Sequence, residues 1–133
     1  MWFKIKVNRD IVLESGKEKN IIEYYLSDCD NFAQAGYNVM KYLNGKCEIE
    51  DVMLMKSYKP LANKKYSENN KVFIVKLAED FQMDDGTIKT QKYPVIFQAN
   101  NNADLQKILK LFMAQGFDNM RICTISETKW KIV

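Results

Sequence analysis

The acidic side chains are the residues of this sequence whose type and spacing come nearest to catalysis. Glu79 and Asp80 are adjacent, as are Asp84 and Asp85, and Glu14 occupies a similar place earlier in the chain. Paired carboxylates can transfer protons or bind a divalent cation. These residues cluster at predicted hairpin turns, where acidic side chains commonly hydrogen-bond the local backbone, and a turn supplies too few oxygen ligands for a metal. We interpret them as solvated turn residues.

Other catalytic arrangements are excluded by residue type. The chain of 133 residues contains no histidine, so a Ser-His-Asp or Cys-His arrangement cannot form. Neither a GxxxxGK[ST] nor a GxGxxG run occurs, and both phosphate-binding loops depend on such runs. We therefore expect a protein that is not an enzyme and that has neither a cofactor nor a metal.

The three cysteines, Cys29, Cys47 and Cys123, are odd in number and widely spaced. No CxxC pair exists, so the pattern favours neither a zinc site nor a disulfide framework. We interpret them as small apolar residues in a reduced, cytoplasmic compartment. The first residues lack the pattern of a signal peptide, and no apolar run approaches the roughly 20 residues that span a bilayer, so no membrane association is expected. The net charge of +3 permits a polyanionic partner without requiring one.

An internal repeat predicts the architecture that must position these residues. The alternating stretch 2–7 returns as 72–77, and Gly16 and Leu26 recur 70 residues later as Gly86 and Ile96. After the helix the offset becomes 71, which maps Gly45 onto Gly116 and Leu54 onto Ile125. The repeated pattern predicts an α+β fold of two tandem ββαβ repeats with pseudo-twofold symmetry, mainly antiparallel sheets and one helix per repeat.

Each repeat is expected to contain the same elements. A glycine turn at Gly16 or Gly86 joins the first strand to a second strand at 19–27 or 89–97. Asp30 or Asn31 is expected to cap the first helix and Asn102 the second, and apolar stripes run along 32–43 and 105–113. The third strands are expected near 48–57 and 120–129, and the last one can continue through 133. The residues expected in the core are Leu26, Val39, Ile96, Leu109 and Phe112.

The repeats predict the domain boundaries. Residues 1–58 form the first repeat, 59–71 a polar linker and 72–133 the second repeat, and together they are expected to build one compact domain. Lys64, Lys65 and Lys71 make this linker basic.

Several short motifs resemble a known family. They are Trp2-Phe3-x-x-Lys6-Val7, Tyr25-Leu26-x-Asp28-Cys29, Phe97-Gln98-Ala99 and Ile125-Ser126-Glu127-Thr128-Lys129. With the two-repeat layout, they resemble the uncharacterised Domain of Unknown Function 4494 family of Bacteroidota and their phages. The chain differs in having Cys29 where an alanine is usual and in a shorter passage from helix to strand. The resemblance implies a protein of a bacterium or of a phage, and it implies no activity and no functional residues. If the protein is phage-encoded, the cytoplasm expected from its cysteines is that of the bacterial host.

The sheet face opposite the helices carries the functional hypothesis. We expect this face to mix aromatic, aliphatic and basic side chains, whereas a fully solvated face would be polar. Its candidate interaction residues are Trp2, Lys4, Lys6, Tyr25, Ile74, Lys76, Tyr93 and Phe97.

Two interpretations of this face remain open. The aliphatic residues favour burial, either between the two sheets or against a protein partner or a second copy. The aromatic and lysine residues, with the basic linker, suit single-stranded nucleic acid, since rings stack on bases and lysines neutralise phosphates. The preferred hypothesis is a non-enzymatic interaction protein that works through protein–protein contacts or self-association. A single-stranded nucleic-acid-binding protein is the alternative.

Overall fold

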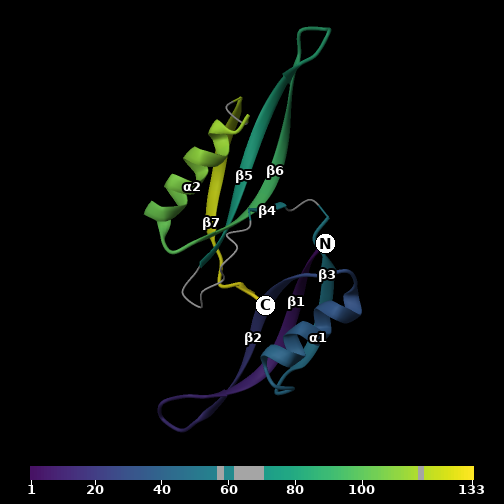
Figure 1. The fold of residues 1–133 in the computed structure, drawn as a ribbon, viewed down its shortest axis with the longest axis vertical. Coiled ribbons are helices and arrows are strands. Elements are labelled where there is room, and N and C mark those ends of the chain that lie inside the picture. The colour runs from purple at the N-terminus through teal and green to yellow at the C-terminus, as the bar shows by residue number, and fades with distance from the viewer. Residues whose placement is uncertain (57–58, 62–70, 117–118) are drawn as a thin grey trace. The chain divides into compact units, whose positions relative to one another are not determined.

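Two antiparallel hairpins, each followed by a helix and a third strand, make up the computed structural model (Figure 1). It describes residues 1–56, 59–61, 71–116 and 119–133. The predicted α+β class is confirmed. The described chain divides into two compact units, one formed by Met1–Lys56 with Lys129–Val133 and the other by Ser57–Thr128. Neither helix in these ranges is long and apolar enough to cross a membrane.

Unit 1 is a four-stranded sheet in the order β3-β1-β2-β8, with helix α1 on one face. Its elements are β1 (Trp2–Val12), β2 (Glu18–Asp28), α1 (Phe32–Tyr42), β3 (Glu48–Leu54) and β8 (Lys131–Ile132). The β1–β2 and β1–β3 pairs are antiparallel, whereas β8 runs parallel to β2. The core under α1 contains Phe3, Ile5, Val7, Tyr25, Ala35 and Val39.

Unit 2 repeats this arrangement in the order β4-β6-β5-β7, with helix α2 packed on the sheet. Its elements are β4 (Lys59–Leu61), β5 (Lys71–Gln82), β6 (Ile88–Ala99), α2 (Asn102–Ala114) and β7 (Met120–Glu127). Here β4 is the strand that runs parallel to its neighbour, β6. The core contains Phe73, Val75, Leu77, Val95, Phe97, Ala99, Leu105 and Leu109.

Turn and cap chemistry explains where these elements begin and end. Gly16 and Gly86 adopt φ of +82° and +84° in equivalent hairpin turns, as predicted, because a left-handed residue closes each turn. Asn31 caps α1, as one of the two predicted alternatives. The cap of α2 is Asn101 and not the predicted Asn102. In each case the asparagine side chain accepts a hydrogen bond from the backbone N–H three residues later, at Gln34 or Asp104.

The third strands differ from the predicted repeat in their register. Each contains a β-bulge, opposite Lys6/Val7 in β1 and opposite Lys76/Leu77 in β5. Counted through the ladders, Leu54 pairs with Phe3 as Glu127 pairs with Phe73, so the predicted match of Leu54 to Ile125 is wrong. Both third strands contain the bulge, so the bulge does not cause the mismatch. The helix caps Asn31 and Asn101 are 70 residues apart, whereas Leu54 and Glu127 are 73 apart, because the second repeat has three more residues between its helix cap and its third strand.

The domain boundaries also differ from those predicted. The predicted linker 59–71 contains β4 and the first residue of β5, and residues 129–133 belong to unit 1 and not to the second repeat. Of the predicted core residues, Leu26, Val39, Ile96 and Leu109 are buried and Phe112 is partly buried.

Candidate interaction surfaces

The sheet face of unit 1 opposite α1 carries Trp2, Lys4 and Lys6, as predicted. These residues alternate along β1 with the buried Phe3, Ile5 and Val7, and all three are partly exposed. Their neighbours across β2 are Tyr24, which pairs with Lys6, and Leu26, which pairs with Lys4. This face therefore does place aromatic and basic side chains together, but its tyrosine is Tyr24.

Tyr25 lies on the other face of the sheet, so its predicted placement is wrong. It pairs with Ile5 and points toward α1, where it is fully buried and its ring lies 5.8 Å from that of Tyr42. Directly opposed residues of an antiparallel pair share one face, so the pairing with Ile5 settles the direction of Tyr25.

Unit 2 shows the same correction. Ile74 and Lys76 lie on the face opposite α2, as predicted, whereas Tyr93 and Phe97 pair with Leu77 and Phe73 and lie on the α2 side. Phe97 is fully buried, and its ring meets that of Phe112 edge-on at 5.4 Å. The prediction assigned β2 and β6 to faces from their own alternation, but the hairpin register decides which alternate set faces the helix.

The basic residues of unit 1 have partners within the protein. The Lys4 Nζ lies between two rings, 4.6 Å from the centroid of Tyr24 and 4.4 Å from that of Trp130. The Lys6 Nζ lies 3.2 Å from the Glu50 carboxylate. Aromatic faces and carboxylates both satisfy an ammonium group, so neither lysine is positioned mainly for a phosphate.

The predicted basic linker is only partly visible. Lys64 and Lys65 lie outside the described residues. Lys71 begins β5, and its Nζ lies 3.1 Å from the Glu127 carboxylate on β7. Lys76 is exposed on the sheet face opposite α2, although Val72 and Ile96 on the same face are buried.

A charged cluster that sequence reasoning missed joins β1, β2 and β8. Arg9 donates to Glu23, the Tyr25 hydroxyl donates to the same carboxylate at 3.1 Å, and the Lys131 Nζ lies 3.4 Å from it. Burial raises the pKa of Glu23, but hydrogen bonds from Arg9 and Tyr25 and the positive charges of Lys131 and Arg9 outweigh it, so the pKa lies below its ordinary value. Burial together with the nearby Glu23 charge raises the pKa of Tyr25.

This cluster has the character of a structural contact. Its carboxylate is held ionised by two cations, which is the opposite of a carboxyl prepared to donate a proton. The only sequence signal for it was the position of Arg9 and Glu23 on facing strands. Lys131 could not be included, because the pairing of β8 with β2 links residues more than 100 positions apart.

An open depression of about 420 Å³ lies beside the bulge of β3. It is lined by Asn8, Arg9, Asp10, Asn20, Lys46, Cys47 and Glu48. Its amides bond one another and the nearby carboxylates: Asn20 donates to Asn8 and Asp10, and Asn8 donates to Glu50 at 3.1 Å. These mutual hydrogen bonds leave few groups aimed at a ligand.

A family model matches residues 1–133, the whole chain. The chain belongs to the domain of unknown function family DUF4494. Comparison with curated proteins finds no match. The family description assigns no activity, so the surfaces of this DUF4494 protein must be interpreted from their own chemistry.

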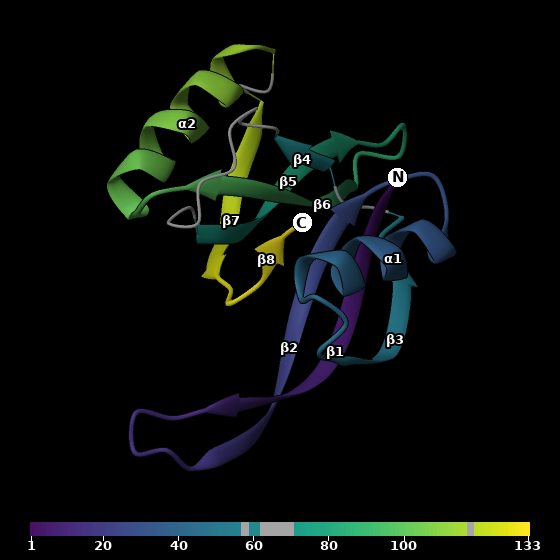
Figure 2. The same cartoon turned by 60° about the horizontal axis from the view of Figure 1, so that its bottom comes forward.

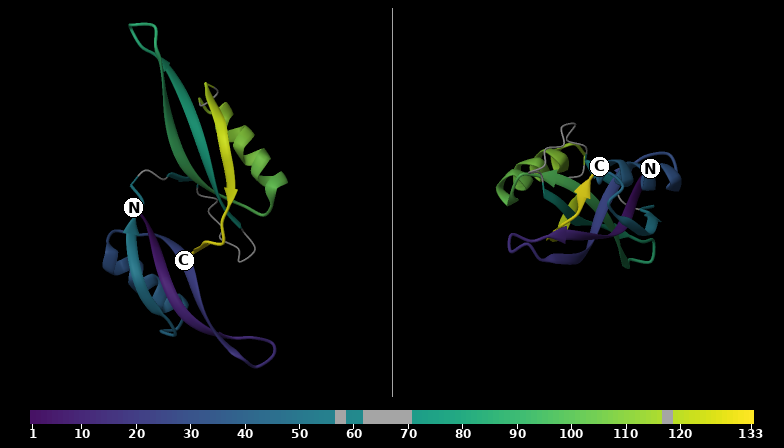
Figure 3. Two further views of the ribbon diagram at one scale, coloured as in Figure 1. Left: turned by 180° about the vertical axis from the view of Figure 1, so that it is seen from behind. Right: turned by 90° about the horizontal axis from the view of Figure 1, so that it is seen from below.

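Among the described residues of this DUF4494 protein, the two most exposed large apolar side chains, Val12 and Ile88 at 71% each, lie near the ends of its two hairpins. We call residues 9–22 and 79–92 the hairpin arms; each continues well past the helix of its own unit (Figures 1 and 3). The exposed large apolar residues of the arms are Val12, Leu13, Ile22, Phe81, Met83 and Ile88. Leu13 and Met83 occupy equivalent places beside the two turns and are 40% and 46% exposed.

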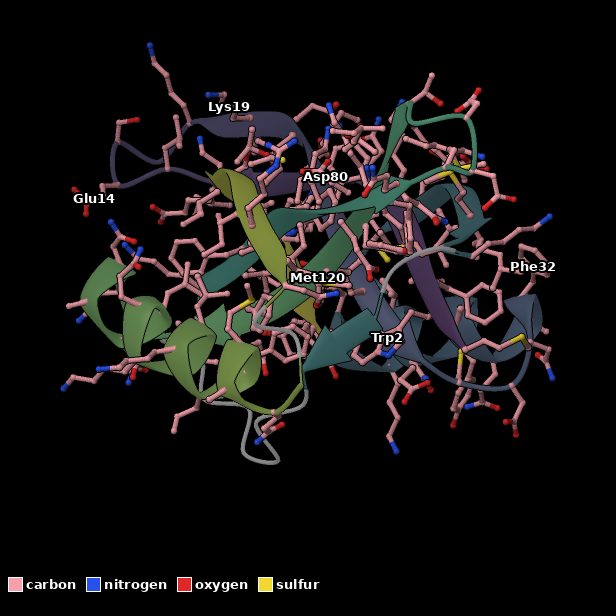
Figure 4. All side chains as sticks on the ribbon, turned by 90° about the horizontal axis from the view of Figure 1, so that it is seen from above. Trp2, Glu14, Lys19, Phe32, Asp80 and Met120 are labelled. Atoms are coloured by element: carbon pink, nitrogen blue, oxygen red, sulfur yellow. The ribbon has the colours of Figure 1, made fainter. Side chains whose placement is uncertain are left out.

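Polar residues share a face of each arm with some of these apolar residues. Asp10 and Asn20 lie on the face of Val12, and Asp80 and Thr90 lie on the face of Ile88. Asn20 donates to Asp10 at 2.9 Å in the first arm, and the Thr90 hydroxyl donates to Asp80 at the equivalent position of the second. Charged side chains such as Glu14 and Lys19 point outward from the first arm (Figure 4). Each arm therefore carries exposed apolar side chains together with hydrogen-bonded polar ones, and sequence analysis did not identify this surface.

Proposed function

We propose that this protein is a non-enzymatic interaction protein that binds a protein partner through its two hairpin arms. The observation that supports the proposal is the equivalent exposure of Leu13 and Met83, together with the apolar residues around them. Single exposed apolar residues are ordinary on protein surfaces. Here they recur at corresponding places in two projecting elements whose own unit does not bury them.

The arms are suited to binding because they are ordered before a partner arrives. Cross-strand pairing continues to Val12 and Glu18 in the first arm and to Gln82 and Ile88 in the second. The side-chain bonds at Asp10 and Asp80 brace both strands of each arm. A prearranged surface loses less conformational entropy on binding, and each large apolar side chain that becomes fully buried contributes about 1.5–3 kcal/mol.

The proposal includes a cytoplasmic location. All three cysteines are free thiols in the structure, which fits a reducing compartment. The bacterial or phage setting rests on family resemblance.

A photo-crosslinking experiment tests the proposal. A benzophenone amino acid is placed at Leu13 or Met83 and, as matched controls, at Tyr37 on α1 or Leu111 on α2, which are exposed apolar positions outside the arms. After irradiation in cells of the source organism, we expect one protein partner to be captured from both arm positions and from neither helix position. Capture at equal yield from all four positions, or from none, would overturn the proposal.

The purified partner then allows a quantitative measurement. Leu13→Asp and Met83→Asp should each weaken its affinity at least about tenfold, because an unpaired carboxylate would have to be desolvated in the contact. Leu111→Asp serves as the control and should leave affinity unchanged. Circular dichroism establishes that each variant remains folded.

The nucleic-acid alternative has less support from the side-chain contacts. Lys4, Lys6 and Lys71 each have a partner within the protein, and Tyr25 and Phe97 are buried. Fluorescence anisotropy with labelled single-stranded DNA and RNA at low salt tests it. We expect no binding; binding that weakens steeply as salt rises would instead favour the alternative, since phosphate contacts release counterions.

A further inference from the structure

The segment Trp130–Val133 is seated on the β2 edge of unit 1 as a docked strand (Figure 2). Lys131 pairs with Tyr25 and Ile132 with Leu26 in a parallel ladder, and the backbone N–H of Val133 donates to the Leu26 carbonyl at 2.9 Å. An extended segment that adds to a sheet edge gains its affinity from such backbone bonds and its specificity from alternate side chains.

Three side chains anchor the segment to unit 1. The Trp130 ring covers the Lys4 ammonium, Lys131 reaches Glu23, and Val133 packs against the core formed by Phe3, Ile5 and their neighbours. The β2 edge is therefore a built acceptor site for a short strand with an aromatic, a basic and two aliphatic residues in succession.

The chain that delivers this segment comes directly from unit 2. Thr128 is the last residue of that unit, and its backbone N–H and hydroxyl both donate to the Val72 carbonyl, at 2.9 and 2.8 Å. Only Lys129 separates this bond from the anchored Trp130. The same arrangement recurs after β3, where the Met55 N–H donates to the Trp2 carbonyl at 2.9 Å shortly before β4 joins the sheet of unit 2.

Each unit thus completes its sheet with a strand whose preceding neighbour in the chain belongs to the other unit. We infer that the β2 edge also accepts the Trp130–Val133 segment of a second copy of this chain, so that two copies exchange β8 and form a strand-exchanged dimer. Every ladder bond and anchor described above is retained in such a dimer, because the incoming segment is identical to the outgoing one.

Two features favour exchange. The docked strand makes only two ladder pairs, so its release breaks few bonds. Only Lys129 connects Thr128 to the anchored Trp130, and short connections of this kind favour strand exchange between copies. Docking within one chain has the advantage of a high effective concentration. Exchange is therefore expected to depend on protein concentration, with monomer in dilute solution and dimer in concentrated solution.

Isotope-coded cross-linking of the unaltered full chain tests this inference. Equal amounts of ¹⁴N and ¹⁵N protein are unfolded, mixed and refolded at high concentration, and monomer and dimer are separated by size-exclusion chromatography with light scattering. A zero-length carbodiimide reagent then joins the Lys131 amine to the Glu23 carboxylate, which lie 3.4 Å apart. Mass spectrometry reads whether the two linked peptides come from one isotopic chain or from two.

We expect about half of the Glu23–Lys131 links in the dimer fraction to join ¹⁴N to ¹⁵N peptides, and none in the monomer fraction, as random reciprocal exchange requires. The Lys6–Glu50 pair, 3.2 Å apart and entirely within unit 1, is the internal control and should remain isotopically pure in both fractions. A dimer whose Glu23–Lys131 links are pure would overturn the inference, as would the lack of any dimer at the highest soluble concentration. Leu13→Asp should leave exchange unchanged, so failure here is distinguishable from failure of the arm proposal.

Discussion

The Lys4 ammonium lies 4.4 Å from the centroid of the Trp130 ring, which ties the segment after β7 to the first strand of the chain. Tyr24 covers the same ammonium from β2 at 4.6 Å. This contact joins residues 126 positions apart, and it closes unit 1 with a segment that follows unit 2 in the sequence.

Trp130→Ala should loosen the docked segment. The loss of one cation–π contact is worth about 0.5–2 kcal/mol, which corresponds to a roughly twofold to thirtyfold fall in the protection of the Val133 amide against hydrogen exchange. Trp130→Phe retains a ring and should lose less. If the Val133 amide exchanges at the wild-type rate in the alanine variant, Trp130 does not anchor the segment.

Leu109→Ala should destabilise unit 2 by about 2–5 kcal/mol, because Leu109 is buried in the core and its truncation leaves a cavity. Leu111→Ala on the same helix is the matched control; Leu111 is 67% exposed, so a change within about 0.5 kcal/mol is expected. Urea unfolding followed by circular dichroism gives both values. Equal effects of the two substitutions would show that the buried face of α2 is misassigned.

Gly16→Ala and Gly86→Ala should each cost about 1–2 kcal/mol through backbone strain alone. Both glycines have positive φ, and an added Cβ would meet nothing within 4 Å, so no steric contact contributes. Gly36→Ala within α1 provides the contrast. Its Cβ would lie 3.4 Å from the Ile49 Cδ1, an ordinary contact, and the helix should gain up to about 1 kcal/mol. The same urea titrations measure the three variants, and a stabilised Gly16→Ala would contradict the assigned turn.

The docking of residues 130–133 should weaken in acid because of Glu23. The pKa of this carboxyl is lower in the folded protein than in the unfolded chain, so its stabilising effect is present above the unfolded value of about 4.3 and is lost as pH falls through the lower folded value. Hydrogen exchange of the Val133 amide, corrected for intrinsic rates, should therefore show falling protection below about pH 4.3. Glu23→Gln should reduce that pH dependence. An unchanged profile in this variant would show that other carboxyls control the transition.

Local chemistry was sufficient to predict most of the elements. The alternation of Phe3, Ile5 and Val7, the glycines at 16 and 86 and the apolar stripes of the helices predicted the α+β class and the order of elements within each unit. These features act over a few residues, through side-chain periodicity and the left-handed backbone of the turns, so a sequence displays them directly. Asn102 shows the limit of this precision, since the cap lies one residue earlier at Asn101.

Pairing across the sheets decided the rest. The hairpin register places Tyr25 and Phe97 on the helix side, and a shift of one residue would have placed them on the opposite face with no change in their own alternation. The bulges near Glu50 and Cys123 and the docking of Lys131 beside Glu23 depend on partners that are distant in the chain. The sequence by itself determined which residues alternate along the strands, which form the turns and which cap the helices. Only the tertiary structure determined which sheet face each alternating set of side chains occupies and which strand completes each sheet. Those choices are made by long-range hydrogen bonds, which leave no local pattern in the sequence.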